Sequence, residues 1–292
     1  MISEFAPAKV NLTLRVGAAR EDGYHPLDSL VVFADWGDHI AVTAADTLDL
    51  EISGEGAETL ADEGTNLVLT AARALHKAAR LPVFAGAHIH LTKKIPLGSG
   101  LGGGSADAAA TLRALSRLWH LNWPPGRLAE IGAQIGSDIP ACVYSRPLRM
   151  TGRGEVIDLL PAWPQLDAVL CLPGVSVSTR TVFAEFDAAA PKALPDADLP
   201  SARSMTDALT IVGESANDLE PAAARVAPVI ADSLAVLHAT DGVQLAGLSG
   251  SGATSWAVFD NRVRARAASD ALGHAHSAWR FVPVRLGGQG EA

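Results

Sequence analysis

Polar and apolar residues alternate strictly near the start of the chain, over residues 9–16. The apolar positions are Val10, Leu12, Leu14 and Val16. A period of two is typical of a β-strand with one buried face. We therefore predict a strand here, on which Lys9 and Asn11 share the opposite, polar face.

Other apolar runs predict a mixture of strands and helices in the first half of the chain. Four further runs have the length of strands, at residues 30–36, 39–44, 48–53 and 87–94. Apolar residues at helical spacing predict three helices. These would run from a cap at Thr65 to about Arg80, from near Ser105 onward, and from Pro124–Pro125 to a stop at Gly136.

The second half has a different order of elements. Apolar runs predict strands at residues 166–172, 243–248, 254–259 and 279–285, and helices at 218–238 and 262–272. The order β-α-β-β-α-β is that of a ferredoxin-like domain, here with extra helical material after its first strand and a surface loop at residues 188–200. We predict an α+β fold with two domains, residues 1–160 and 161–292.

Composition limits the class of protein. The 292 residues fit about two domains. The net charge of −9 argues against a partner that needs a positive field, such as nucleic acid or an anionic membrane surface. Two cysteines, no long apolar stretch and no signal peptide at the N-terminus favour a soluble, cytoplasmic protein.

The stretch from Pro96 to Ala106 carries the clearest functional signal. Five glycines fall within seven residues, between a predicted strand and a predicted helix: Gly98, Gly100, Gly102, Gly103 and Gly104. Glycine costs about 0.5–1 kcal/mol to order in regular structure, so this density indicates a sharp turn that a ligand approaches closely. The following helix directs its free amides and its positive end at the loop. This favours a phosphate-binding loop over a flexible linker.

Three common nucleotide-binding motifs do not fit. Gly98-x-Gly100-x-x-Gly103 satisfies the dinucleotide fingerprint, but residues 120–122 lack the acid expected about 20 residues later. The Gly-Lys-Ser/Thr of a Walker A loop occurs nowhere in the chain. The His-Arg-Asp and Asp-Phe-Gly motifs of protein kinases are absent as well.

Three motifs together resemble the GHMP superfamily of small-molecule kinases. They are Ala6–Leu12, the loop Pro96–Ala106 and Gly247–Thr254, in the order found in that superfamily. The resemblance implies ATP as the phosphoryl donor. It also implies the two-domain GHMP kinase fold, with an N-terminal nucleotide domain like domain 2 of ribosomal protein S5 and a C-terminal ferredoxin-like substrate domain.

Further segments resemble one branch of the superfamily, the 4-diphosphocytidyl-2-C-methyl-D-erythritol kinases. They are Arg20–Leu27, Gly136–Pro140, Gly152–Glu155 and Asn217–Pro221. Ala106 stands where a second serine is common and Ser137 where alanine is common, and neither change removes a group that the chemistry requires. The resemblance implies phosphorylation of the 2-hydroxyl of 4-diphosphocytidyl-2-C-methyl-D-erythritol, in non-mevalonate (MEP) isoprenoid and terpenoid biosynthesis.

The resemblance also implies a catalytic pair and an ATP site. Asp138 would be the base that takes the hydroxyl proton, and Lys9 would keep it ionised and neutralise charge on the moving phosphoryl group. Mg²⁺ would accompany ATP, but the sequence does not indicate its protein ligands. Asn66 would lie in the adenosine pocket, and the phosphates would lie against Pro96, Leu97, Gly98, Ser99, Gly100, Leu101, Gly102, Gly103, Gly104, Ser105 and Ala106.

The expected partner is a small molecule that carries a cytidine diphosphate. By resemblance, Asn11 would orient its diol, Tyr24 would stack on the cytosine and His25 would read the base edge. Phe183 would form the opposing face, with Thr181 beside it. A base–aromatic stack is worth about 1–3 kcal/mol, enough to decide recognition of the cytidyl group.

Simpler interpretations stay open for several of these residues. Asp138 could be only a helix cap, Lys9 a solvated lysine, Tyr24-His25 part of a turn and Phe183 ordinary core. Two other functions also stay open: a GHMP kinase for another small alcohol, of the mevalonate, homoserine or sugar type, and a regulatory module that binds nucleotide without turnover. We expect a monomer or a homodimer.

Overall fold

The computed structural model describes residues 1–61, 66–82, 85–194, 198–215 and 217–287. Its internal contacts divide the chain into two compact units, and each unit is built from segments that are not consecutive in the sequence. Unit 1 comprises Met1–Lys9, Trp36–Leu97 and Gly102–Ser145, and unit 2 comprises Val10–Asp35, Gly98–Leu101 and Arg146–Ala292. The glycine-rich loop therefore contributes to both units. The domains at residues 1–160 and 161–292 stay a prediction.

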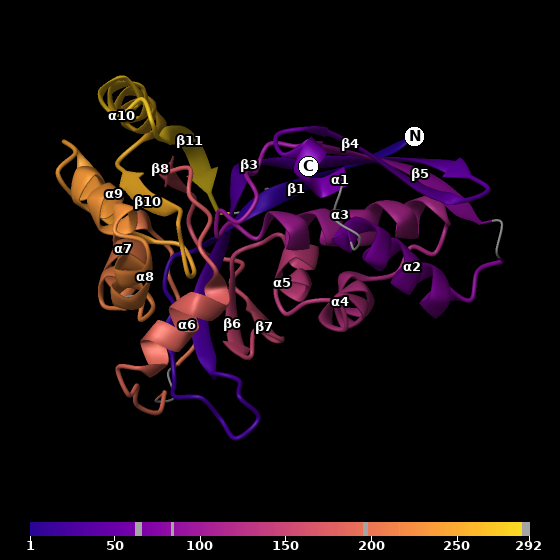
Figure 1. Cartoon of the computed structure of the whole chain (residues 1–292), viewed down its shortest axis with the longest axis horizontal. Coiled ribbons are helices and arrows are strands. Elements are labelled where there is room, and N and C mark those ends of the chain that lie inside the picture. Colours follow the sequence, from indigo (N-terminus) through magenta and orange to yellow (C-terminus); the bar gives the residue numbers. More distant parts are fainter. Residues whose placement is uncertain (62–65, 83–84, 195–197, 216, 288–292) are drawn as a thin grey trace. The chain divides into compact units, whose positions relative to one another are not determined.

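Unit 1 is a sheet with helices on one side. Its strands are β1 (Ile2–Asn11), the second part of β3 (Leu27–Ala45), β4 (Leu48–Gly54) and β5 (Gly86–Lys93). β5 pairs antiparallel with β3 and parallel with β4, and β1 also pairs with β3. Figure 1 shows α2 to α5 together on one side of β4 and β5. The helices are α1 (Ala57–Ala61), α2 (Leu67–Ala79), α3 (Gly103–Leu118), α4 (Pro125–Ala133) and α5 (Ile139–Tyr144).

The long strand β3 replaces two predicted strands. The sequence predicts separate strands at residues 30–36 and 39–44, but the chain continues through Gly37 without a turn. A Cβ at Gly37 would lie 2.2 Å from the carbonyl oxygen of Ala6. Gly37 therefore allows close approach of the β1 backbone, a use of glycine inside a strand that a sequence pattern does not distinguish from a turn.

The predicted strand at residues 9–16 is wrong in its length and in its single buried face. β1 ends at Asn11, and β2 (Arg15–Val16) follows separately. Lys9, Asn11 and Thr13 are all buried, at 4–5% relative exposure, so both faces are covered. Burial of these polar side chains is tolerated because each has a hydrogen-bond partner in the protein. The Leu30 amide, for example, donates to Thr13 Oγ1.

Each of the three helices predicted for unit 1 begins within two residues of its predicted start, whereas α1 and α5 are not predicted from the sequence. α2 is capped by Asn66, whose Oδ1 accepts a hydrogen bond from the Val68 amide at 2.8 Å. The predicted cap, Thr65, lies outside the described residues. α3 begins at Gly103, two residues before the predicted start. α4 begins as predicted but ends at Ala133, before Gly136.

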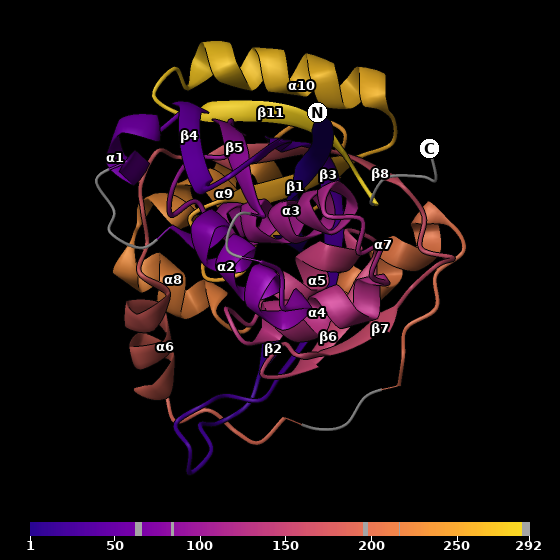
Figure 2. The same ribbon diagram turned by 90° about the vertical axis from the view of Figure 1, so that its right-hand side faces the viewer.

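Unit 2 contains the ferredoxin-like sheet, in the order β11-β8-β10-β9 with antiparallel neighbours. α9 and α10 share one cluster of buried side chains with β8, β9 and β10, and α10 lies along β11 (Figure 2). The strands are β6 (Leu148–Gly152), β7 (Val156–Leu159), β8 (Leu166–Leu172), β9 (Val243–Leu248), β10 (Ser255–Phe259) and β11 (Arg280–Leu286). The helices are α6 (Thr179–Asp187), α7 (Met205–Gly213), α8 (Glu220–Val226), α9 (Val229–His238) and α10 (Arg262–Ala275).

The single long helix predicted at residues 218–238 is wrong. The structure has two helices there, α8 and α9, separated at Ala227 and Pro228. Proline has no amide hydrogen and disfavours helical dihedrals at the residue before it. Ala227 accordingly adopts φ −138° and ψ 92°. The predicted order β-α-β-β-α-β is otherwise present, with α6 and α7 between β8 and α8. Among the described residues no helix has the length and hydropathy needed to cross a membrane.

Candidate active site

Lys9 and Asp138 form an ion pair within unit 1. The Nζ of Lys9 on β1 donates to Oδ2 of Asp138 at 2.9 Å. The lysine side chain is 6% exposed, whereas the aspartate side chain is 37% exposed. The pair therefore has a buried cation and a carboxylate that solvent, or a substrate, can reach.

Asp138 holds the N-cap position of α5 without acting as a cap. Its carboxylate makes no capping hydrogen bond to the described backbone of this helix, although aspartate is a favoured cap. Within the described part of the chain, the carboxylate pairs with Lys9. The simple interpretation of Asp138 as a cap is therefore wrong, and the carboxylate keeps accepting capacity for another group.

The start of α3 lies against Lys9. Gly102 precedes the helix in the left-handed region, with φ +63°, and it has no side chain to cap the first turn. A Cβ at Gly102 would lie 3.3 Å from Cβ and Cε of Lys9. Uncapped amides at a helix start, together with the helix dipole, bind anions. Unit 1 thus brings a lysine, a reachable carboxylate and an anion-binding helix end together.

A second group of charges is buried beneath this part of the loop. Lys93 at the end of β5 binds Asp38 at 2.5 Å and Asp107 on α3 at 2.8 Å, and all three side chains are at most 4% exposed. Asp38 also accepts from the amides of Lys94 and Ile95, which lead into the loop. A Cβ at Gly103 would lie 3.3 Å from Lys93 Nζ. This network therefore fixes the residues that lead into the loop and the first turns of α3 that follow it.

Sequence reasoning missed this network, although a signal was present. Asp107 is a charged residue inside a run of alanines, Ala106 and Ala108–Ala110, all of which are buried. A charge in such a run needs a partner. Burial raises the pKa of Asp107 to about 7, against the lowering effect of Lys93. Its Oδ1 accepts no hydrogen bond within the described part of the chain.

Asn66 lies at the start of α2, close to the glycine-rich loop. The neighbouring Leu67 is exposed, and its Cδ1 would lie 3.3 Å from a Cβ at Gly104. Because Asn66 Oδ1 caps α2, its side chain has a structural use that is independent of any ligand. Its part in an adenosine pocket stays a prediction.

In unit 2 the middle of the loop is held by the third motif. The carbonyl oxygen of Ser99 accepts from the amide and the hydroxyl of Thr254, at 3.1 and 2.6 Å. A Cβ at Gly100 would lie 2.2 Å from the carbonyl oxygen of Gly252. Only glycine allows this approach, and its φ of +79° adds a second reason. Two motifs that are far apart in sequence therefore form one structure.

Asn11 joins the first motif to the same structure. Its amide donates to Ser249 Oγ at 3.2 Å, and its carbonyl oxygen accepts from the indole of Trp256 at 3.1 Å. Its side-chain Nδ2 donates to Ser29 Oγ at 2.7 Å. The Asn11 side chain is thereby fixed, with Oδ1 near Gly250. A role toward a diol stays a prediction.

The residues predicted to bind cytosine lie in unit 2. His25 Nδ1 is 2.9 Å from the carbonyl oxygen of Gly17, and its Nε2 is 3.4 Å from Asp187 Oδ2. The rings of His25 and Phe183 are 4.9 Å apart. Phe183 is thus packed against His25. Thr181 is exposed in the first turn of α6.

Tyr24 is 54% exposed, with the guanidinium of Arg153 4.2 Å from its ring centroid. Arg153 is held in turn by Asp22 at 2.5 Å. The segment Gly152–Glu155 thus contributes Arg153 as a neighbour of Tyr24, a contact that the sequence did not predict. Stacking of a base on Tyr24 stays a prediction.

A family model described as the GHMP kinases N terminal domain matches residues 66–146, a range that includes α3 and Asp138. This match, together with the full-length relatives and the solved structure described next, defines the chain as a GHMP kinase, an ATP-dependent small-molecule kinase.

Two curated relatives identify the branch of the GHMP kinases to which the chain belongs. A protein of Paramagnetospirillum magneticum named 4-diphosphocytidyl-2-C-methyl-D-erythritol kinase is 45% identical, over 96% of this chain and 97% of its own length. One of Cereibacter sphaeroides with the same name is 44% identical, over 99% and 100%. The chain belongs to the 4-diphosphocytidyl-2-C-methyl-D-erythritol kinase family.

Solved structures agree with this assignment. A crystal structure of 4-(cytidine 5'-diphospho)-2C-methyl-D-erythritol kinase is 31% identical with a TM-score of 0.78, covering 98% of this chain and all of the other. Homoserine kinase from Cytophaga hutchinsonii has a TM-score of 0.75 at 20% identity, covering 99% and 96%, and shares the fold. The predicted α+β GHMP kinase fold is confirmed.

Proposed function

We propose that the chain transfers the γ-phosphoryl group of ATP to the 2-hydroxyl of 4-diphosphocytidyl-2-C-methyl-D-erythritol, a step of the MEP route to isoprenoids. The observation that carries the proposal is the Lys9–Asp138 ion pair beside the uncapped start of α3. The names of the full-length relatives supply the substrate. The family domains would be residues 1–160 and 161–292.

Asp138 is the base in this proposal. Phosphoryl transfer has a loose transition state, so catalysis depends on positioning and on neutralising charge. Asp138 accepts the proton of the attacking hydroxyl, and Lys9 holds the carboxylate in place and offsets negative charge on the phosphoryl group. The amides of Gly103, Gly104 and Ser105 face the phosphates, since the helix leaves them without internal partners.

Magnesium fits the available donors as an ion carried with the nucleotide. Mg²⁺ prefers oxygen ligands and keeps several waters, with few protein ligands. Among the described residues there is no group of three or more His, Cys, Asp or Glu that could hold a metal ion. The Ser105 hydroxyl, on the first turn of α3, is an oxygen donor that would contact it. When bound, the ion neutralises charge on the phosphate oxygens.

Substrate recognition falls to the unit 2 residues. Asn11 would orient the methylerythritol diol, because its side chain is fixed by Ser29. His25 and Phe183 form an aromatic pair that would bind the cytosine, with Tyr24 stacking on it and Thr181 beside it. The Nδ1–H of His25 would donate to Gly17, and Nε2, which lies 3.4 Å from Asp187 Oδ2, is the ring nitrogen that would face the exocyclic amine of cytosine. Cytoplasmic location and a monomeric or homodimeric state stay predictions.

A coupled assay of ADP release tests this function. We expect turnover with the cytidyl substrate far above the ATP-only rate, and a clear loss when uridyl replaces cytidyl. Equal rates with mevalonate, homoserine or a sugar would favour another acceptor. ATP binding without turnover on any alcohol would favour a regulatory module instead.

A further inference from the structure

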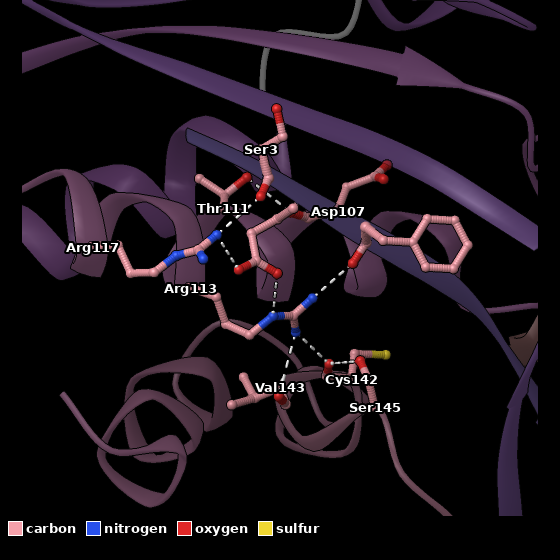
Figure 3. A network of polar contacts seen from close by, with 10 residues as sticks. Ser3, Asp107, Thr111, Arg113, Arg117, Cys142, Val143 and Ser145 are labelled. Atoms are coloured by element: carbon pink, nitrogen blue, oxygen red, sulfur yellow. Dashed lines mark hydrogen bonds and ion pairs between the residues drawn. The ribbon is translucent and has the colours of Figure 1, made fainter. Parts of the chain in front are cut away.

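Arg113, in the middle of α3, binds two other elements of unit 1 at once (Figure 3). Its Nε donates to Glu4 Oε2 at 2.9 Å, and its Nη2 donates to the carbonyl oxygen of Phe5 at 2.8 Å. Its Nη1 donates to the carbonyl oxygens of Cys142 and Val143, at 2.8 and 3.3 Å. The Arg113 side chain is 19% exposed, and all three nitrogens of its guanidinium donate hydrogen bonds.

These two elements are the ones that carry the ion pair. Phe5 lies on β1, four residues before Lys9. Cys142 and Val143 lie in the last turn of α5, the helix that follows Asp138. A cation at the last carbonyls of a helix is favourable, both by hydrogen bonding and by the helix dipole. The contacts close a ring: Lys9, β1, Arg113, α5, Asp138 and back to Lys9.

We propose that Arg113 is a positioning residue that keeps Asp138 aligned with Lys9 during the reaction, an inference that rests on the proposed function. When Asp138 accepts the hydroxyl proton, its carboxyl becomes neutral and its attraction to Lys9 falls. The Arg113 contacts to backbone carbonyls do not change at that step. The Arg113 contacts therefore keep α5 attached to β1 at the step in which the Lys9–Asp138 ion pair is weakest.

The chain offers a matched control on the same helix. Arg117, one turn further along α3, donates to Glu4 Oε1 at 2.6 Å and to the carbonyl oxygen of Ser3 at 2.9 Å. Both of these partners lie on β1. Arg117 thus shares the strand and the acidic partner with Arg113, whereas the hydrogen bonds to the carbonyl oxygens of α5 come from Arg113.

The test compares Arg113→Gln with Arg117→Gln in the complete chain. We expect Arg113→Gln to lower kcat about 10- to 100-fold, because a displacement of about 1 Å at reacting groups costs about that much. The KM for ATP should change less than about twofold, since the start of α3 is not touched. Arg117→Gln should keep kcat within about twofold. Equal kcat values for the two variants would overturn the inference.

A second comparison separates positioning from general structural damage. The single-turnover rate is measured for Asp138→Asn with and without Arg113→Gln. The two rates should be equal, because the effect of Arg113 passes through Asp138. A purely structural role would lower the rate by the same factor in both backgrounds. If Asp138→Asn itself retains full activity, the base assignment fails, whereas an inactive Asp138→Asn with a fully active Arg113→Gln overturns the Arg113 inference alone.

A conservative variant covers the case in which Arg113→Gln does not fold. Arg113→Lys keeps the charge beside Glu4 but replaces a planar fork by one ammonium, which lacks the geometry to serve both elements. We expect its kcat to lie at least about fivefold below that of Arg117→Lys. Equal kcat values for the two lysine variants would overturn the inference.

Discussion

Lys9 Nζ and Asp138 Oδ2 lie 2.9 Å apart although the residues are 129 positions apart in the chain. The lysine is buried and the aspartate is partly exposed. Breaking such a pair from the carboxylate side leaves a buried cation without its partner, which is costly. The two residues therefore depend on each other structurally as well as in the proposed reaction.

Replacing Asp138 by asparagine tests the base. Asparagine keeps the shape of the side chain but accepts no proton, and we expect kcat to fall about 10²- to 10⁴-fold. The affinity for ATP should stay within a few-fold, measured by titration calorimetry, because the α3 amides remain. Asp232→Asn, an exposed position on α9, is the control and should keep full activity. Full turnover by Asp138→Asn would rule out its role as base.

Gly102 tests the close approach of the loop to Lys9. Alanine at φ +63° costs about 1–2 kcal/mol, and its Cβ would lie 3.3 Å from the Lys9 side chain. We expect Gly102→Ala to lower the Tm by a few degrees and to reduce kcat/KM for ATP. The control is Gly273→Ala in α10, where a Cβ meets nothing within 4 Å and helix propensity favours alanine. That variant should raise the Tm slightly, and a similar loss in both variants would contradict the account.

The buried carboxyl of Asp107 predicts a pH dependence of stability. Burial raises its pKa to about 7, so between about pH 4 and pH 7 the folded chain binds more protons at this group than the unfolded chain. Its contribution to the free energy of unfolding therefore falls as the pH rises through that range. In Asp107→Asn this slope should be absent, which denaturant titrations at pH 5 and pH 7.5 can measure.

Asp207 provides the control for this pH dependence. It is an exposed residue in the first turn of α7, where it forms a capping box with Ser204, and its pKa is lowered, chiefly by the hydrogen bond from the Arg203 amide. A lowered pKa places its titration below pH 4, so Asp207→Asn should change the stability equally at pH 5 and pH 7.5. If Asp107→Asn keeps the slope of the unaltered chain, the raised pKa is wrong.

Tyr24 tests recognition of the cytidyl group. Removing a stacked ring costs about 1–3 kcal/mol, so Tyr24→Ala should raise the KM for the cytidyl substrate about 5- to 100-fold and leave the KM for ATP unchanged. Tyr24→Phe keeps the ring and should keep the KM within about twofold. An unchanged KM in Tyr24→Ala would show that the exposed ring, with Arg153 on it, does not serve the base.

The ferredoxin-like strands could be predicted closely from sequence. β8 and β9 have the predicted limits, because their apolar runs end at polar residues or at prolines and glycines. Two predicted limits were wrong. The sequence predicts a break near Gly37, where the strand continues, and a continuous helix at Pro228, where the helix is interrupted. Gly37 has the sequence pattern of a turn, but it lies inside a strand because a neighbouring backbone approaches it closely. Pro228 lies in an apolar pattern that continues at helical spacing, but it separates two helices.

The partners of the buried charges could not be predicted. Asp38, Lys93 and Asp107 come from a strand, a strand end and a helix, and only tertiary structure brings them together. Arg113 has an ordinary place in a helical sequence, and its bonds to Phe5, Cys142 and Val143 are to backbone oxygens that no side-chain pattern reveals. The motifs contain the groups proposed to react, whereas the contacts that hold these groups in place are visible only in the fold.

The most direct test of the central claim follows the phosphorus atoms. ATP, Mg²⁺ and 4-diphosphocytidyl-2-C-methyl-D-erythritol are incubated with the chain and observed by ³¹P NMR. The account predicts a new phosphate monoester on the substrate, formed in step with ADP, and formed at least about 100-fold more slowly with Asp138→Asn. ADP formed together with free inorganic phosphate, or a monoester formed equally well by Asp138→Asn, would contradict it.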